Sequence, residues 1–264
     1  MFISQVEADD IVLFGLFATY DRRMALLEYV GHATVHVELD GVRLLTDPLL
    51  RSRVAHLRRA APPPALPPAD AVLISHGHYD HLDVPSLRKL GASPTVIVPR
   101  GLGAHLTDFD VLEVSEGDEV EIGAVTVRAT HAEHEGGRPL RGESPALGYV
   151  LSGSRRIFFA GDTDLFDGMD GLVAELDVAL LPIWGWGGDL GRGKHLDPVR
   201  AAEAVRRLRP KLVVPIHWGT YRPIHRSARA TFLTEPARAF SRAAASAAPE
   251  VEVRILRPGE RLAF

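Results

Sequence analysis

The segment Ser75-His76-Gly77-His78-Tyr79-Asp80-His81 decides how the rest of the chain is interpreted. It follows residues 70–75, Asp-Ala-Val-Leu-Ile-Ser, which predict a short buried strand. His76 and His78 are two residues apart, so in extended backbone their side chains project to the same side, and Gly77 lets the backbone pass close to an ion. A carboxylate and a third imidazole follow where the chain bends toward a helix. Neutral imidazole and carboxylate suit zinc, iron or manganese, so the segment predicts a metal site rather than a solvated polar loop.

The composition limits the chemistry of any such site. The chain has 264 residues, 46% of them hydrophobic and 24% charged, which is ordinary for a globular protein that buries its own core. It contains no cysteine, so a metal must be held by His, Asp or Glu. The 12 histidines are a generous supply, and the net charge of −4 argues against a nucleic-acid partner.

The chain divides into an N-terminal extension, residues 1–24, and a domain over residues 25–264. The extension is either a short helix or strand packed on the domain, or a translated leader with Met24 as the true start. Its apolar run, residues 11–20, is too short to cross a membrane, and acidic residues precede it where a signal peptide carries positive charge. We expect a cytoplasmic protein without integral membrane association.

Strand-like segments open the domain, with a hairpin signal at Asp40-Gly41. Asp47 follows the last of them and is either a turn former or a carboxylate that orients a metal-bound histidine. His32, between the first two, is either a hydrogen-bonded loop histidine or a group with a direct role. The three segments are residues 26–30, 33–39 and 42–46.

A basic, proline-rich stretch over residues 51–69 interrupts this pattern. Its proline cluster predicts irregular backbone. The stretch is either a solvated linker or a flap near the site, whose arginines meet an anionic substrate.

Three further apolar segments end in candidate metal ligands, as residues 70–75 do. These strands are predicted over residues 125–129, 156–160 and 212–216. The candidates that follow them are His131 and His134, then Asp162, then His217.

His195 stands just before a predicted helix over residues 198–208. Asp197 is a good N-cap for that helix, and Pro198 is a good first residue. His195 is therefore either a loop histidine before a helix or a group that faces the substrate.

Strands followed by helices occur twice along the chain. This order predicts an α/β protein with two sheets packed face to face and helices outside, an αββα sandwich with the ligands along one edge. Other helices are predicted over residues 84–90, 101–106, 172–176 and 235–247, and a closing strand over 251–256.

The ordered set of His76, His78, Asp80, His81, a later histidine, Asp162 and His217 resembles the signature of metallo-β-lactamase fold hydrolases. The closer likeness is to the N-acyl-phosphatidylethanolamine phospholipase D family and its bacterial relatives, and the chain is also similar to the L-ascorbate-6-phosphate lactonases. The likeness covers residues 28–260. The segments that carry it are 31–34, 46–48, 67–76, 158–163, 195–198 and 216–220.

The resemblance implies two divalent metal ions, Zn²⁺ first and Mn²⁺ or Fe²⁺ as alternatives. His76, His78 and the later histidine would hold one ion, and Asp80, His81 and His217 the other, with Asp162 bridging both. The family pattern Thr-Pro-Ser/Ala-x-His, laid on residues 130–134, favours His134 as the later histidine. His131 then stands at the proline position and remains the alternative.

The implied activity is hydrolysis by a metal-bridging hydroxide, with a phosphodiester as the expected substrate. The substrate would be a small or lipid-like molecule, and the alternative is a lactone or carboxylic ester. Asp80, Asp162 and His195 are expected to act in the reaction, His195 because it matches a family residue close to the substrate phosphate. Asp47, His32 and His131 are expected to support ligands or contact substrate.

Overall fold

We describe a computed structural model of the chain, which places residues 25–91, 93–136, 144–184, 195–224 and 231–264. The N-terminal extension predicted over residues 1–24 lies outside these described residues, so its status stays a prediction.

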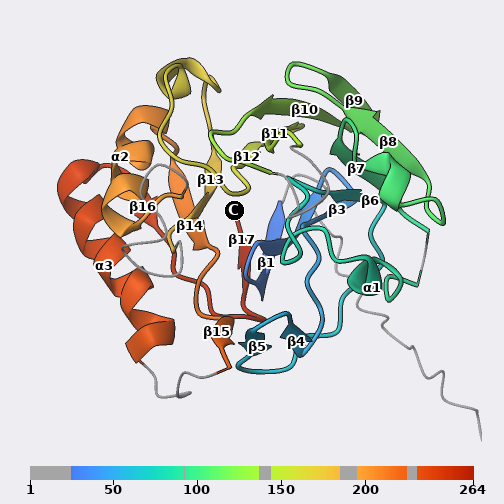
Figure 1. The fold of residues 1–264 in the computed structure, drawn as a ribbon. Coiled ribbons are helices and arrows are strands. Elements are labelled where there is room, and N and C mark those ends of the chain that lie inside the picture. The colour runs from blue at the N-terminus through green and yellow to red at the C-terminus, as the bar shows by residue number, and fades with distance from the viewer. Residues whose placement is uncertain (1–24, 92, 137–143, 185–194, 225–230) are drawn as a thin grey trace, which may run out of the picture.

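Two seven-stranded sheets pack face to face and confirm the expected sandwich (Figure 1). The first sheet contains, in spatial order, β17 (Arg261–Ala263), β1 (Leu26–Gly31), β2 (Thr34–Leu39), β3 (Val42–Thr46), β6 (Ala71–Leu73), β7 (Thr95–Pro99) and β8 (Val111–Val114). The second contains β16 (Glu252–Val253), β14 (Leu212–Ile216), β13 (Val178–Pro182), β12 (Arg156–Phe159), β11 (Leu147–Ser152), β10 (Val125–His131) and β9 (Glu119–Ile122).

Helices α2 (Pro198–Leu208) and α3 (Thr231–Ala247) pack together beside the second sheet (Figure 1). The predicted cap of α2 is confirmed, because the Asp197 side chain accepts hydrogen bonds from the backbone amides of Val199 and Arg200. Beside the first sheet, the described residues form the single-turn helix α1 (Val84–Leu87) and a short 3-10 turn, Gly103–His105.

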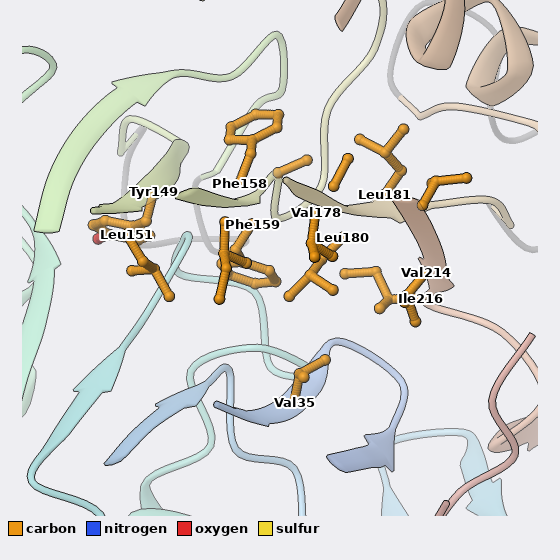
Figure 2. Close-up of a cluster of buried hydrophobic side chains, with 14 of the residues drawn as sticks. Val35, Tyr149, Leu151, Phe158, Phe159, Val178, Leu180, Leu181, Val214 and Ile216 are labelled. Atoms are coloured by element: carbon orange, nitrogen blue, oxygen red, sulfur yellow. The ribbon is translucent and has the colours of Figure 1, made fainter. Parts of the chain in front are cut away.

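The main core lies between the two sheets. Val35 of β2 faces side chains from the second sheet, including Phe159 and Leu180, and all three are buried (Figure 2). Strands β13 and β14 are buried along their whole length. Each large apolar side chain removed from water in this way stabilises the fold by roughly 1.5–3 kcal/mol.

Parallel pairing gathers the ends of the strands that precede the candidate ligands. Strands β3, β6 and β7 are parallel neighbours, as are β12, β13 and β14. Strand β10 is antiparallel to β11, which is antiparallel to β12, so β10 runs in the same direction as β12. Carboxyl ends of parallel strands meet at one edge of a sheet, where ligand sites of open α/β sheets form.

The structure corrects several local predictions. The stretch 51–69 contains two short strands, β4 (Arg53–Val54) and β5 (Leu57–Arg59), which form a small sheet with β15 (Tyr221–Pro223). Residues 172–176 are not helical and follow a single 3-10 turn, Met169–Gly171. The closing strand shrinks to the two residues of β16, and α3 begins four residues earlier than predicted, with Pro236 inside it. Strand β17, which pairs with β1, was not predicted.

Candidate metal centre

His76, His78 and His134 form the first group of donors. Their ring nitrogens converge, with His76 Nε2 at 2.9 Å and His134 Nε2 at 3.3 Å from His78 Nδ1. The loops that carry them are joined by a hydrogen bond of 2.9 Å from the Gly77 amide to the Gly136 carbonyl. A Cβ at position 77 would lie 2.9 Å from that carbonyl oxygen, so this contact between the two loops requires glycine at position 77.

Asp80, His81 and His217 form the second group, and His32 joins them. Asp80 Oδ2 lies 3.0 Å from His32 Nε2, 3.8 Å from His81 Nε2 and 3.9 Å from His217 Nε2. The His217 amide donates to the His32 carbonyl at 2.7 Å, which ties the end of β14 to the turn between β1 and β2. Both histidines have positive φ, 59° and 60°, so this close approach is built into the backbone.

Asp162 lies between the two groups. Its Oδ2 is 3.2 Å from His81 Nε2 and 3.3 Å from His195 Nδ1, while its Oδ1 is 3.4 Å from His217 Nε2. It also forms a cluster of potential ligand atoms with His134 and His195. Asp162 therefore stands where the resemblance predicted a bridging carboxylate.

Asp47 supports the candidate metal centre through contacts with Ser75 and His81. Its carboxylate is fully buried, accepts from the amide and hydroxyl of Ser75 at 2.7 and 2.6 Å, and lies 2.7 Å from His81 Nδ1. Because a carboxylate only accepts, Nδ1 of His81 carries the hydrogen and its Nε2 is left to face Asp162. A Cβ at Gly161 would lie 2.5 Å from the Ser75 Cβ, so only glycine lets β12 approach this segment.

His131 is not brought to the centre. Its side chain is 41% exposed, lies 3.3 Å from a carboxylate oxygen of Glu116 and 3.4 Å from one of Glu133, and packs against Phe166. Three residues later the chain has turned inward and His134 reaches the first group. Of the two histidines that the sequence left open, the geometry therefore favours His134.

The two carboxylates of the centre stay ionised. Burial raises the pKa of Asp80, but His81 and His32 outweigh burial and hold that pKa well below its usual value. For Asp162 burial acts in the same direction, and His217 and His81 again hold the pKa well below the usual value.

The imidazoles of His76 and His32 stay neutral. Burial lowers the pKa of His76 well below its usual value and that of His32 to about 3. A neutral His32 that faces an ionised Asp80 donates its Nε2 hydrogen to the carboxylate, so His32 positions Asp80. His81 differs, because although burial lowers its pKa, Asp162 and Asp80 raise it well above the usual value.

The donor set fits a divalent cation. His81 Nε2, Asp162 Oδ1 and His195 Nδ1 are buried, and within the described part of the chain no hydrogen bond of good geometry satisfies them. Buried polar atoms are nearly always satisfied, and neutral nitrogen and carboxylate oxygen are the donors that zinc, manganese and iron accept. We infer that cations would satisfy these atoms.

Thr163 connects three of the segments that carry candidate ligands, and sequence reasoning missed this role. Its Oγ1 accepts from the Glu133 amide at 2.9 Å, next to His134, and its carbonyl accepts from the Leu196 amide at 2.9 Å, next to His195. The one signal in the sequence was its position directly after Asp162.

Comparison with known proteins identifies the family. Residues 42–218 match the beta-lactamase superfamily domain. The chain belongs to this superfamily and has the metallo-β-lactamase fold, as the motif predicted.

Its relatives include metal-dependent hydrolases. A UPF0173 metal-dependent hydrolase of Methanopyrus kandleri is 33% identical over 250 residues, covering 89% of this chain and 97% of the relative. An N-acyl-phosphatidylethanolamine-hydrolyzing phospholipase D of Caenorhabditis elegans is 31% identical, covering 83% of this chain and 68% of the relative. Against uncharacterized mycobacterial relatives, the match spans only 60% of their length.

Solved structures agree with this assignment. Igni18, a metallo hydrolase from Ignicoccus hospitalis, superposes with a TM-score of 0.67 at 25% identity, and the match covers 91% of this chain and 98% of that one.

Among the residues that the structure describes, no helix is both long and apolar enough to span a membrane.

Proposed function

We propose that this chain is a metal-dependent hydrolase with two metal ions, and that its substrate is a phosphodiester. One observation carries the proposal: Asp162 lies between two separate groups of donors. His76, His78 and His134 would hold one ion, and Asp80, His81 and His217 the other. His32 would act by holding Asp80, with which it shares a contact of 3.0 Å.

Two bound divalent ions would lower the pKa of a shared water and offset negative charge on the attacked group. The chain's own residues provide the geometry around that chemistry. Asp47 fixes the ring of His81, and Asp162 Oδ2 faces Nδ1 of His195. Nε2 of His195 then lies on the other side of the ring, where it would donate a hydrogen to the leaving oxygen of a substrate while both ring nitrogens are protonated.

The phosphodiester is supported by likeness rather than by the ligands, which serve ester and lactone hydrolysis equally. The segments around Asp162 and His195 resemble phospholipases D of the N-acyl-phosphatidylethanolamine type, and the relative from C. elegans carries that name. Lactone or carboxylic ester hydrolysis is the alternative that the experiment must separate.

The test combines metal counting with turnover. Purified protein loaded with Zn²⁺ or Mn²⁺ is assayed on bis(p-nitrophenyl) phosphate and on a panel of small lactones, with bound metal measured by mass spectrometry. The variants are His78→Ala, Asp162→Ala and, as the matched control, His131→Ala. His131 precedes His134 by three residues but lies outside the first group, so its removal should leave both metal content and rate unchanged.

We expect two metals per chain and phosphodiester turnover that both active-centre variants abolish. Turnover of lactones alone would replace the phosphodiester by the alternative substrate. A wild-type protein that binds no metal, or a His131→Ala variant as impaired as His78→Ala, would contradict the proposed centre.

A further inference from the structure

A cavity lies next to Trp218 and Gly219, which directly follow the candidate ligand His217. It has a volume of about 640 Å³ and opens between α3 and the residues that follow β14 and β16. This volume is in the range of small-molecule sites in proteins. Its apolar lining consists of Trp218, Gly219, Leu233, Ala237, Ile255 and Pro258.

Two cations line the cavity as well, Arg238 on α3 and Arg257 after β16. Neither guanidinium makes an ion pair or side-chain hydrogen bond with the described residues, and none of the described residues that line the cavity is acidic. Arg242, one turn further along α3, differs because it pairs with Glu235 at 2.8 Å. The cavity therefore combines an apolar wall with two guanidinium groups that no carboxylate of the described residues pairs with.

We propose that this cavity binds a small amphipathic carboxylate. The aliphatic or aromatic body would pack against Trp218 and Leu233, and the carboxylate would bind between Arg238 and Arg257. Arginine binds carboxylates through two parallel hydrogen bonds, and an apolar wall with a few polar groups is the usual composition of a small-molecule site. This inference is independent of the proposed hydrolysis.

The ligand would lie directly against the backbone that carries a candidate metal ligand. Trp218 follows His217, its Nε1 donates to the Pro215 carbonyl at 2.8 Å, and its own carbonyl accepts from the Tyr29 hydroxyl at 2.7 Å. A narrow pocket lined by His32 and His217 shares Trp218, Gly219 and Leu233 with the cavity. Binding of a ligand in the cavity should therefore change the fluorescence of Trp218.

The experiment titrates the metal-loaded protein with decanoate, decanol and decyltrimethylammonium, using calorimetry and tryptophan fluorescence. We expect decanoate to bind tightest. Replacing both cations, in Arg238→Gln/Arg257→Gln, should weaken decanoate about tenfold or more and leave decanol unchanged, because the hydrogen bonds to a charged group are lost. Arg242→Gln is the matched control and should bind decanoate like the wild type.

Two further variants test whether the ligand binds inside the cavity. Ala237→Phe fills it from the buried side of α3, and Ser241→Phe fills it from a partly exposed position if the first variant does not fold. Either should abolish decanoate binding. The proposal is overturned if decanoate does not bind or if decanol binds as tightly as decanoate. It is also overturned if the double arginine variant keeps wild-type affinity for decanoate, which is the result expected if the carboxylate binds to the metals instead.

Discussion

At the scale of single residues, the first sheet contains a buried histidine, His36, whose ring nitrogens have no hydrogen-bond partner among the described residues. His36 lies on β2 and is 2% exposed. Burial, followed by the nearby Arg261 and Arg43, lowers its pKa from 6.5 to about 4. The folded state therefore resists protonation of His36, whereas the unfolded chain accepts a proton near pH 6.5.

This difference gives the stability a defined pH dependence. The contribution of neutral His36 to the free energy of unfolding is complete above pH 6.5. It is lost as the pH falls toward 4, because the unfolded chain then binds a proton that the folded chain does not. At pH 5 the loss due to His36 is about 2 kcal/mol. Urea unfolding at pH 7.5 and pH 5 should show that His36→Met loses less stability than the wild type by about this amount. Equal losses would show that His36 does not titrate in this range.

Thr163 is the residue whose hydroxyl we expect to position the metal ligands. Thr163→Val keeps the shape but leaves the Glu133 amide without its acceptor, at a cost of about 1–3 kcal/mol. We expect zinc affinity, measured by competition with a chelator, to fall about tenfold or more. Thr163→Ser keeps the hydroxyl and should restore the affinity. A purely structural role would instead lower stability in Thr163→Val with unchanged zinc affinity.

At the scale of elements, the small sheet sorts its arginines onto two faces. Arg222 of β15 is directly opposite Arg58 of β5, which is directly opposite Arg53 of β4, so three like charges share one face. Arg59 points to the other face, where it is buried and donates to the carbonyls of Val30, Leu49 and Ala61. Arg59 is therefore structural, whereas Arg53 and Arg58 are exposed, and a contact between these two arginines and an anionic substrate stays a prediction.

Substitution of the two neighbours should therefore have opposite effects. Like charges directly opposite on adjacent strands destabilise a sheet, so Arg58→Gln should raise the free energy of unfolding by about 0.2–1 kcal/mol at low salt and by less at high salt. Arg59→Gln should lower it by at least about 2 kcal/mol, because the buried carbonyls of Val30 and Leu49 lose a charged donor. Urea unfolding at two salt concentrations measures both. A destabilising effect of Arg58→Gln would show that other interactions offset the repulsion between Arg53, Arg58 and Arg222.

At the scale of the whole molecule, the candidate metal centre draws its donors from both sheets. Asp47, His76 and His81 follow strands of the first sheet, whereas Asp162 and His217 follow strands of the second. A cation held by both sets would bind the folded chain only, and ligands that bind only the folded state stabilise it by mass action. The metal is therefore expected to lock the two sheets together.

Removal of the metal should lower the melting temperature, and the size of the effect should depend on pH. The pKa of His81 is raised well above its usual value by Asp162 and Asp80 despite burial, so a proton must leave before a cation binds there. The difference in melting temperature between zinc-loaded and chelator-treated protein should be larger at pH 7.5 than at pH 5.5. His131→Ala should behave like the wild type, and a difference that grows toward acid pH would contradict this linkage.

The sequence by itself determined the sandwich and most of the candidate centre. Apolar runs that end in His, Asp or Gly predict buried strands with polar ends, and this signal is local, so the donors at 76–81, 162 and 217 could be identified without coordinates. The cap at Asp197 was equally readable, because capping depends on three consecutive residues.

Only the tertiary structure decided what depends on contacts between distant segments. His134 rather than His131 reaches the centre because of where β10 ends against the loop at Gly77. His32 is paired with Asp80 by the close approach of two turns, and Arg59 is buried because β5 pairs with β15. Such choices follow from strand register and direction, in which a shift of one residue turns a side chain from the core to the solvent, and no local pattern encodes them.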